Sequence, residues 1–534
     1  MKRAATMLAV SLAISMVVGA CASMQPGGRD LVAKAVSAQG GADALSAVKT
    51  LSYKATSRQW EPEQSAIAGG EMRLANDATL VSVTDVAAGA TRNDWVRNFH
   101  YPAPRTFTFS EIVTAQAGYV AGIDSNGRTK QSREANPPAH SMSGLRLSTA
   151  QRELLRESPL LALEMSKNPD RVTSASSVSI GGVSHPAVNY RLGEQTLTVL
   201  FDPATGLPAR VRSLDYDNIW GDVTYDLVLA DWQTVGGARV AMSRKYELNG
   251  RTVTEVKLSE ATVNTPIPAD RLAIPGPFLA AARKPAVGQV PYQWIIRRQF
   301  IGTYLDSDQP SYDTQGSPGL RLQELAPGIQ HVVGGSHNSL IVEMKDHVIV
   351  FDAPVSDWQS TWTISAARGK YLRKPVKYLV LTHHHMDHAG GVRAYADAGA
   401  TIVTGKGTAA HFRRVLAAPF TRNPMLSSRD LGQTPIVEVA DKHVLTDGQR
   451  RVEMYVLDPN PHSEGLLIGY VPDAQLGFVT DIWSPGAAPL PERLTPALAA
   501  LVAGVKKAGI TPAKFAGGHG TTADYAPLAA LEGK

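Results

Sequence analysis

The densest cluster of metal-binding side chains in the chain lies in the stretch Thr382–Gly391, which reads Thr-His-His-His-Met-Asp-His-Ala-Gly-Gly. A short apolar run, Tyr378–Leu381, precedes it and has the pattern of a buried strand. Burying so many ligand-type side chains together without a metal ion would be costly. The stretch therefore predicts a metal-binding loop at the end of a strand. Gly390 and Gly391 are expected to let the backbone turn sharply into the next helix.

The spacing of the cluster divides its side chains between two sites. His383 and His385 are two residues apart, so they face the same side of an extended loop and can bind one ion. Asp387 and His388 are left to face a second ion. His384 points away from the first pair, and we expect it to support the ligands without binding metal.

The segments around the cluster predict a layered α/β domain. Ile329–Val333, Leu340–Met344 and Val348–Phe351 have the composition of strands, and Asp357–Leu372 has that of a helix. Strands and helices continue to alternate toward the C-terminus, as in layered α/β folds.

The His-x-His-x-Asp-His pattern of His383 to His388 resembles the metallo-β-lactamase superfamily, and the resemblance covers roughly the last 215 residues. It implies an αββα sandwich for this part of the chain. Three downstream residues match further ligand positions of the family: His462 in Asn-Pro-His-Ser, Asp481 after Phe-Val-Thr, and His519 in Gly-Gly-His-Gly. Asp352 matches a structural aspartate of the family.

The resemblance implies a pair of metal ions with a complete ligand set. One ion would be bound by His383, His385 and His462, and the other by Asp387, His388 and His519, with Asp481 bridging the two. Zinc suits these ligands, and iron or manganese stay open. A hydroxide between the ions would attack the substrate, with Asp387 as the catalytic residue that orients it. His337 could approach the mouth of the site but is interpreted as structural. His411, in a predicted helix, is interpreted as packed or solvated.

The implied function is hydrolysis of an ester, thioester, lactone or related bond of a small molecule. Zinc β-lactamases generally carry Cys or Ser where this chain has Asp481, so β-lactamase activity is an alternative and not the first choice. A sulfatase or phosphodiesterase activity also stays open. An iron-dependent oxidoreductase of the same fold is a second alternative. In a third, the N-terminal half binds a ligand and the metal ions only stabilise the fold.

The N-terminus has the features of a bacterial lipoprotein signal. Lys2 and Arg3 precede an apolar run up to Ala20, too short and wrongly flanked for a membrane-spanning helix. The run ends in Val-Gly-Ala-Cys, which resembles a lipobox, and Cys21 is the only cysteine in the chain. We expect residues 1–20 to be a signal peptide, Cys21 to be lipidated, and the protein to be exported and anchored, with the outer membrane favoured.

The chain of 534 residues is too long for one ordinary core, so we expect an α+β chain of two domains. A tether, 21–30, precedes an antiparallel β-rich domain with a few helices, 31–275. Gly40 and Gly41 separate two of those helices, and residues 148–167 are predicted to be helical. By layout this domain resembles periplasmic lipoprotein carriers. A linker, 276–319, leads to the hydrolase domain, 320–534.

The N-terminal half contains no recognisable catalytic motif. His100, His140 and His185 stand alone and are interpreted as solvated or core residues, so no chemistry is assigned to this half. The formal net charge of the whole chain is +5, and Lys2 and Arg3 contribute two of these charges. Such a weak bias, together with export, argues against nucleic acid as a partner and leaves a small-molecule substrate and the membrane.

Overall fold

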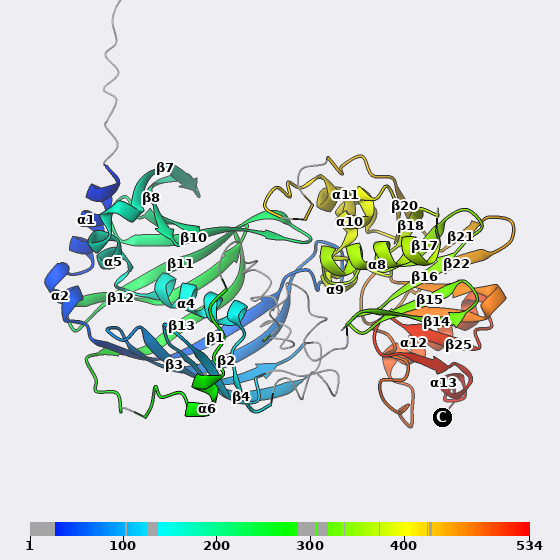
Figure 1. Ribbon diagram of the computed structural model, residues 1–534, viewed down its shortest axis with the longest axis horizontal. Coiled ribbons are helices and arrows are strands. Elements are labelled where there is room, and N and C mark those ends of the chain that lie inside the picture. Colours follow the sequence, from blue (N-terminus) through cyan, green and yellow to red (C-terminus); the bar gives the residue numbers. More distant parts are fainter. Residues whose placement is uncertain are drawn as a thin grey trace, which may run out of the picture.

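The computed structural model describes residues 27–101, 104–124, 137–268, 270–286, 306, 319–335, 337–372, 374–423, 425–426 and 430–533. The predicted signal peptide, Cys21 and most of the predicted tether and linker lie outside these residues. Within the described residues, no helix has both the length and the apolar character needed to cross a membrane. The chain is a mixed α+β protein with an N-terminal and a C-terminal region (Figure 1).

The N-terminal region is built on one antiparallel sheet, in which thirteen strands are described. Its first and last strands in the sequence, β1 and β13, pair with each other in the middle of the sheet. In sheet order the strands are β6 (Ala139–Ser141), β5 (Gly118–Gly122), β4 (Arg105–Val113), β3 (Ala90–Phe99), β2 (Arg73–Asp85), β1 (Thr50–Glu61), β13 (Arg251–Val263), β12 (Ala238–Leu248), β11 (Gly221–Val235), β10 (Pro208–Asp217), β9 (Gln195–Phe201), β8 (Val183–Leu192) and β7 (Val172–Ile180).

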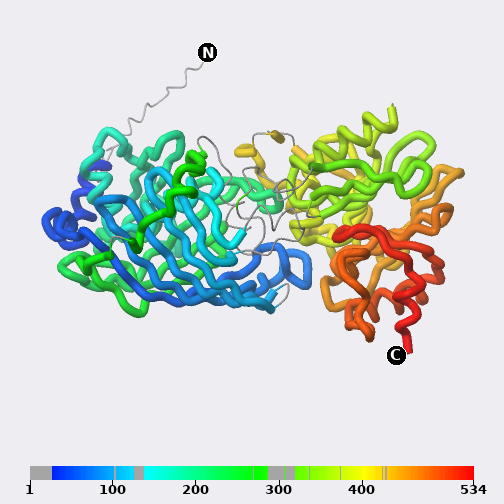
Figure 2. The backbone as a smooth tube through the Cα atoms, turned by 60° about the horizontal axis from the view of Figure 1, so that its bottom comes forward, coloured from blue at the N-terminus to red at the C-terminus, as the bar shows by residue number. Residues whose placement is uncertain are grey.

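Alternation of side chains explains how this sheet buries one of its faces. Along β1, Leu51, Tyr53 and Ala55 are buried, while the residues between them are more exposed. The sheet is strongly curved, and α4 crosses its inner side (Figure 2). The other helices of the region pack near the β7–β8 end, except the helix that follows β13, which packs against β6 at the opposite edge of the sheet. The helices are α1 (Gly28–Ala38), α2 (Ala42–Ala47), α4 (Gly144–Glu157), α5 (Leu161–Lys167), the 3₁₀ turn η1 (Pro169–Arg171) and α6 (Gly276–Ala280).

Two glycines and one proline interrupt these helices. Gly40 and Gly41 have φ angles of +117° and +90°, so the predicted break between α1 and α2 is confirmed. The segment predicted to be helical over residues 148–167 is instead two helices. Pro159 restricts the preceding residue to extended geometry, and Ser158 accordingly has ψ of 129° and ends α4.

The C-terminal region contains two sheets. The first runs β14 (Arg321–Ala326), β15 (Ile329–Val333), β16 (Ser339–Glu343), β17 (Val348–Phe351), β18 (Val376–Val380), β19 (Thr401–Gly405) and β20 (Ile436–Val439). The second runs β21 (Lys442–Thr446), β22 (Arg451–Val456), β23 (Leu467–Val471), β24 (Leu476–Val479), β25 (Lys514–Gly517) and β26 (Thr522–Asp524). The helices are α8 (Asp357–Lys370), α9 (Met386–Ala389), α10 (Val392–Asp397), α11 (Ala409–Ala417), α12 (Pro496–Ala508), α13 (Ala526–Ala529) and the 3₁₀ turn η2 (Pro472–Ala474).

The two sheets pack face to face with helices on both outer sides. In β17, Ile349 and Phe351 point into the layer between the sheets, whereas Val348 and Val350 point toward α8 and α10. Burying one such side chain contributes ~1.5–3 kcal/mol. On the far side, α12 covers the second sheet through Leu501. The order of layers is therefore helices, sheet, sheet and helices.

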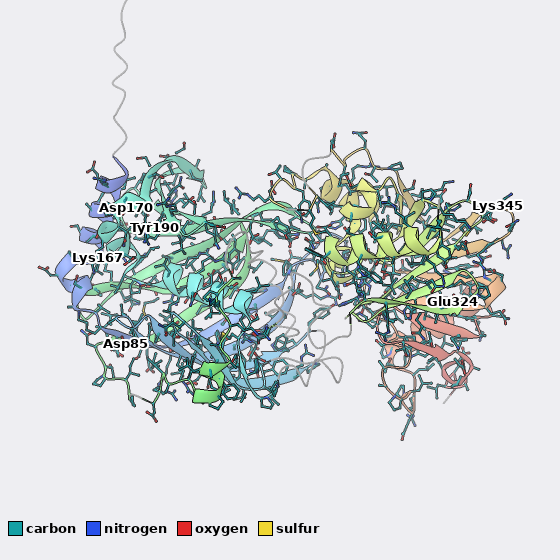
Figure 3. The ribbon with its side chains drawn as sticks, in the orientation of Figure 1. Asp85, Lys167, Asp170, Tyr190, Glu324 and Lys345 are labelled. Carbon is teal, nitrogen blue, oxygen red and sulfur yellow. The ribbon has the colours of Figure 1, made fainter. Side chains whose placement is uncertain are left out.

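Parallel pairing brings several strand ends to one edge of this sandwich. β17, β18 and β19 are parallel, and so are β24 and β25. The segments that follow β17, β18, β24 and β25 carry the residues highlighted by the sequence. Figure 3 places Lys167 and Asp170 at one end of the molecule and Lys345 at the opposite end. In the same orientation, Figure 1 shows α9, which follows β18 at this edge, between the two ends.

Candidate metal centre

The histidine-rich loop follows β18 directly and is buried. His383, His384, His385 and His388 each have no exposed surface. Asp352, at the end of β17, fixes the start of the loop because its Oδ1 accepts a hydrogen bond from the backbone N–H of Thr382 at 2.8 Å. The last part of the loop forms α9.

A first group of side chains converges within 4.8 Å: His383, His385, His462 and Asp481. His462 Nε2 lies 3.2 Å from His383 Nε2 and 3.0 Å from His385 Nδ1. Three ring nitrogens that face one point cannot all donate to one another. A cation at that point would satisfy the lone pairs of all three nitrogens, so the donor set fits a divalent metal ion.

A second group of side chains also converges within 4.8 Å: His337, Asp387, His388 and His519. His388 Nε2 lies 3.3 Å from His519 Nε2, and His337 Nε2 lies 3.0 Å from Asp387 Oδ2. His337 was predicted to be structural, but its ring contacts the residues of this group. Its isolated place in the sequence gave no spacing signal.

Asp481 lies between the two groups. Its Oδ2 is 3.2 Å from His383 Nε2, 3.1 Å from His388 Nε2 and 3.2 Å from His462 Nε2, and its Oδ1 is 2.6 Å from His519 Nε2. One carboxylate thus contacts nitrogens of both groups, which fits a bridging position.

The sequence of this region matches a known family. Residues 332–519 match the family described as the metallo-beta-lactamase superfamily, and the match ends at His519. Residues 332–519 are a metallo-β-lactamase superfamily domain. The buried His/Asp groups of this domain indicate a divalent metal cofactor.

Solved structures of several proteins are similar to part of this chain. A metallo-β-lactamase from Pontibacter korlensis is 19% identical over 40% of this chain and 100% of its own, with a TM-score of 0.30. The stereoselective inverting sec-alkylsulfatase Pisa1 from Pseudomonas sp. is 18% identical over 39% of this chain and 40% of its own, with a TM-score of 0.30. The Flv1 flavodiiron core from Synechocystis sp. PCC6803 is 17% identical over 39% of this chain and 59% of its own, with a TM-score of 0.31. The search of curated proteins found no match to the chain.

Burial and charge set the protonation of the groups in the metallo-β-lactamase domain. Burial lowers the pKa of His383 to about 4 and that of His385 well below its usual value. Burial opposes ionisation of Asp387 and Asp481, but hydrogen bonds and nearby imidazoles hold both carboxyl pKa values well below their usual range. His383 and His385 therefore offer neutral imidazoles, and Asp387 and Asp481 offer ionised carboxylates, which are the forms that bind metal.

The two glycines after the loop serve close packing. Gly390 and Gly391 lie between α9 and α10, where the chain was predicted to turn into the next helix. Their φ angles are −58° and −99°, so neither residue uses a conformation that only glycine adopts readily. A Cβ on Gly390 would lie 2.3 Å from the carbonyl oxygen of Val355, and a Cβ on Gly391 would lie 1.8 Å from Ser360 Oγ. Glycine is needed at both positions because the chain after α9 touches Val355, which precedes α8, and Ser360, which lies in α8.

The N-terminal region also contacts the metal groups, which sequence reasoning missed. Gln64, between β1 and β2, donates a hydrogen bond from Nε2 to Asp387 Oδ1 at 2.7 Å. The carbonyl oxygen of Ser65 accepts hydrogen bonds from His384 Nε2 at 3.0 Å and His385 Nε2 at 2.8 Å. His384 thus lies beside the first group and outside it. No motif marks Gln64 or Ser65 in the sequence.

The other histidines lie apart from these two groups. His100 is exposed beside Asp77, His185 contacts its own strand, and His411 is buried in α11 as predicted. His140 belongs to a third buried group with Asp124 and Asp306. Arg146 occupies this group, with Nη1 2.6 Å from Asp124 Oδ2 and 2.5 Å from Asp306 Oδ2. Its guanidinium already balances the two carboxylates, so the group forms a buried ion-pair network.

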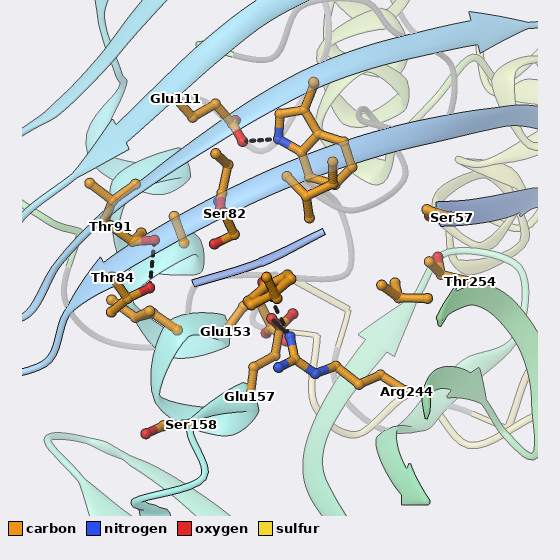
Figure 4. A pocket seen from close by; sticks show the side chains of 18 of the residues that line it. Ser57, Ser82, Thr84, Thr91, Glu111, Glu153, Glu157, Ser158, Arg244 and Thr254 are labelled. Carbon is orange, nitrogen blue, oxygen red and sulfur yellow. Dashed lines mark hydrogen bonds and ion pairs between the residues drawn. The ribbon is translucent and has the colours of Figure 1, made fainter. Parts of the chain in front are cut away.

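A cavity of about 180 Å³ lies in the N-terminal region between the sheet and α4 (Figure 4). Charged side chains in its wall are paired: Arg244 Nη1 lies 2.6 Å from Glu157 Oε2, and Trp95 donates to Glu111 at 2.9 Å. The residues that line this cavity all belong to the N-terminal region. The cavity is therefore separate from the metal groups.

Proposed function

We propose that the protein is a dinuclear zinc-dependent hydrolase that acts on an ester, thioester, lactone or related bond of a small molecule. The position of Asp481 is the observation that carries this proposal. Its carboxylate lies within 3.2 Å of nitrogens from both groups, so it can be shared by two ions. Structural zinc sites are usually closed and contain one ion, whereas paired sites of this kind are typical of hydrolases.

The side chains of the proposed centre have different roles. His383, His385 and His462 would hold one ion, Asp387, His388 and His519 the other, and Asp481 both. When bound, the zinc ions would lower the pKa of a water to near 7 and polarise the oxygen of the scissile bond. The ring of His383 is oriented for this task because Thr382 Oγ1 lies 3.2 Å from His383 Nδ1 and leaves Nε2 facing the centre.

Asp387 would orient the attacking water by accepting a hydrogen bond from it. Its carboxylate cannot rotate freely, because Gln64 holds Oδ1 at 2.7 Å and His337 contacts Oδ2 at 3.0 Å. Because the Asp387 carboxylate is fixed next to the second group, its acceptor oxygen would face the water to be oriented. Positioning of this kind lowers the barrier of a reaction.

The experiment compares purified full-length protein with two histidine variants. The wild type is expected to retain about two zinc ions per chain. It should also hydrolyse at least one chromogenic ester, thioester or lactone. His462→Ala removes a residue of the first group and should lower turnover at least ~100-fold. His443→Ala changes a histidine of β21 outside both groups and serves as the control.

Three outcomes would contradict the proposal. A folded protein that retains no divalent metal would end it. One iron per chain with oxygen- or flavin-dependent activity would favour the iron-dependent oxidoreductase instead. Hydrolysis of a chromogenic cephalosporin with no turnover of the other substrates would favour a β-lactamase.

We also propose that the protein is exported and anchored to the membrane through lipid on Cys21. The support is the sequence alone: the short apolar run and the Val-Gly-Ala-Cys motif. Expression of the wild type and of Cys21→Ser in a Gram-negative host, followed by membrane fractionation and mass analysis of the N-terminal peptide, tests this. A wild type that stays soluble without an acyl mass would refute it.

A further inference from the structure

We propose that residues 62–66 of the N-terminal region support the metal centre by positioning Asp387 and His385. We call these residues the bridging segment. Gln64 is the positioning residue, and the Ser65 carbonyl sets the tautomer of His385. The inference rests on the proposed metal centre and adds to it the role of the N-terminal region.

Gln64 has a fixed side-chain orientation. It is only 4% exposed, and its Oε1 accepts a hydrogen bond from the Tyr101 hydroxyl at 2.6 Å. With Oε1 already an acceptor, Nε2 is the atom that faces Asp387, so the amide can only donate to that carboxylate. Burial, together with the charges of Asp387 and Asp481, raises the pKa of Tyr101 well above its usual value, so its hydroxyl stays a donor.

Asp387 is therefore held from two sides. Gln64 contacts Oδ1 from the N-terminal region, and His337 contacts Oδ2 from the C-terminal region. Oδ2 consequently faces the second group, where His388 and His519 lie. Without Gln64 the carboxylate would lose one of these two restraints and part of its orientation.

The Ser65 carbonyl acts on the first group. Because a carbonyl oxygen only accepts, the hydrogen of His385 must be on Nε2, which lies 2.8 Å away. The free lone pair of His385 is then on Nδ1, the atom that lies 3.0 Å from His462 Nε2. Partners of this kind fix the tautomer and orientation of a ligand histidine.

The bridging segment is itself anchored to the loop that carries His462. The carbonyl oxygen of Ala66 accepts from the backbone N–H of Glu464 at 2.9 Å. Arg73, at the start of β2, donates to the carbonyl oxygen of His462 at 2.6 Å. The guanidinium carbon of Arg73 also lies over the ring of Tyr101, 4.9 Å from the ring centre. The segment thus contacts both the histidine-rich loop and the His462 loop, and its position is coupled to theirs.

The test is Gln64→Leu in the full-length chain, because leucine keeps the volume of the side chain and removes both hydrogen bonds. We expect the dissociation constant of one of the two zinc ions to rise about 10–100-fold in competition with a chelator. The metal-free melting temperature should stay close to that of the wild type. The absorption of the cobalt-loaded protein should change, since the coordination of one ion changes. Gln116→Leu, on an exposed turn between β4 and β5, is the matched control and should bind metal as the wild type does.

Two more variants keep the test decisive. Gln64→Glu places a second carboxylate against Asp387 and should weaken metal binding more than Gln64→Leu. If Gln64→Leu does not fold, Tyr101→Phe takes its place, because it removes only the hydrogen bond to Gln64 Oε1. This variant should weaken the binding of one zinc ion about 3–10-fold.

Wild-type affinity for both ions in Gln64→Leu and Gln64→Glu, or in Tyr101→Phe where only that variant folds, would overturn this inference while leaving the proposed hydrolase intact. A wild type that binds two ions but hydrolyses nothing would overturn the proposed hydrolase. The same affinity measurements would still decide the role of Gln64.

Discussion

Asp352 Oδ2 lies 2.8 Å from His388 Nδ1, and both side chains are completely buried. A carboxylate accepts, so His388 donates from Nδ1 and keeps Nε2 for the metal group. Burial opposes the charged form of His388, but the carboxylates of Asp481 and Asp352 raise its pKa well above its usual value, so a metal ion that binds Nε2 must displace a proton from it. Asp352 thus determines which nitrogen of His388 faces Asp481 and His519.

Asp352→Asn should weaken metal binding without unfolding the chain. Asp352 has φ of +60°, a geometry that asparagine tolerates. Its oxygens accept from Thr382 N, Thr382 Oγ1 and His388 Nδ1, and an amide has only one oxygen to offer. We expect a loss of ~1–3 kcal/mol in the free energy of unfolding and about 10–100-fold weaker zinc binding.

Urea unfolding and chelator competition measure the effects of Asp352→Asn. The control is Asp346→Asn, which changes an aspartate that is 74% exposed beside His347. Equal zinc affinity for Asp352→Asn and the wild type would mean that His388 needs no partner for its orientation.

The positions of the converging residues were predictable to different degrees. His383, His385, Asp387 and His388 are close in sequence, and their alternation along one loop already divides them between two sites. The convergence of His462, Asp481 and His519 depends on the order of strands in two sheets. No local periodicity encodes that order, so only the resemblance to a family predicted it.

Gln64 could not be found from the sequence for a related reason, and no spacing signal placed His337 among the residues of the second group. Gln64 is 323 residues away from Asp387, and an amide after a strand has no recognisable chemistry. Its contact depends on how the curved sheet packs beside the sandwich, which alternation within each strand does not determine. The strands themselves, such as β15 and β17, were predictable from their apolar and β-branched composition, because every residue of both strands is buried and local composition alone indicates such a strand.

Asp481→Asn should remove one ion and most of the activity. Asp481 has φ of +53°, so asparagine keeps the backbone while removing the negative charge that contacts both groups. We expect about one zinc ion per chain instead of two, and turnover lower by at least ~100-fold. Metal analysis after dialysis and steady-state kinetics measure both effects.

The control for Asp481→Asn is Asp473→Asn in η2, where the carboxylate is exposed and pairs with Arg450. Two ions and full activity in Asp481→Asn would show that the carboxylate is not shared.

Gly390→Ala should destabilise the fold through contact with the backbone. The new Cβ would lie 2.3 Å from the carbonyl oxygen of Val355 and 2.7 Å from that of Met386. The backbone of Val355 cannot move easily away from the new Cβ, because this residue is fully buried and has φ of +63°. We expect a loss of ~1–3 kcal/mol in the free energy of unfolding.

Gly369→Ala is the matched control for Gly390→Ala, since a Cβ on Gly369 in α8 meets nothing within 4 Å. It should be neutral or stabilise by up to ~1 kcal/mol in urea unfolding. Equal stability of the two variants would mean that the approach of α9 to the segment before α8 is not close.

His331 should make the stability of the chain depend on pH. It is fully buried in β15, with Nε2 donating to the carbonyl oxygen of Gly517 at 2.9 Å, and burial lowers its pKa from 6.5 to about 4. Between these values the unfolded chain binds a proton that the folded chain does not. The contribution of His331 is therefore fully present above pH 6.5 and is lost as the pH falls toward 4.

His331→Leu should remove this dependence. The carbonyl oxygen of Gly517 would still accept from Asn338 Nδ2 at 3.0 Å, so the substitution leaves that oxygen paired. Between pH 7 and pH 4, the free energy of unfolding of the wild type should fall by ~3 kcal/mol more than that of the variant. Urea unfolding of both proteins across this pH range isolates the contribution of His331 to the free energy of unfolding, because the other titrating groups are common to both proteins. Parallel curves would mean that His331 is protonated to the same extent in the folded and unfolded chains.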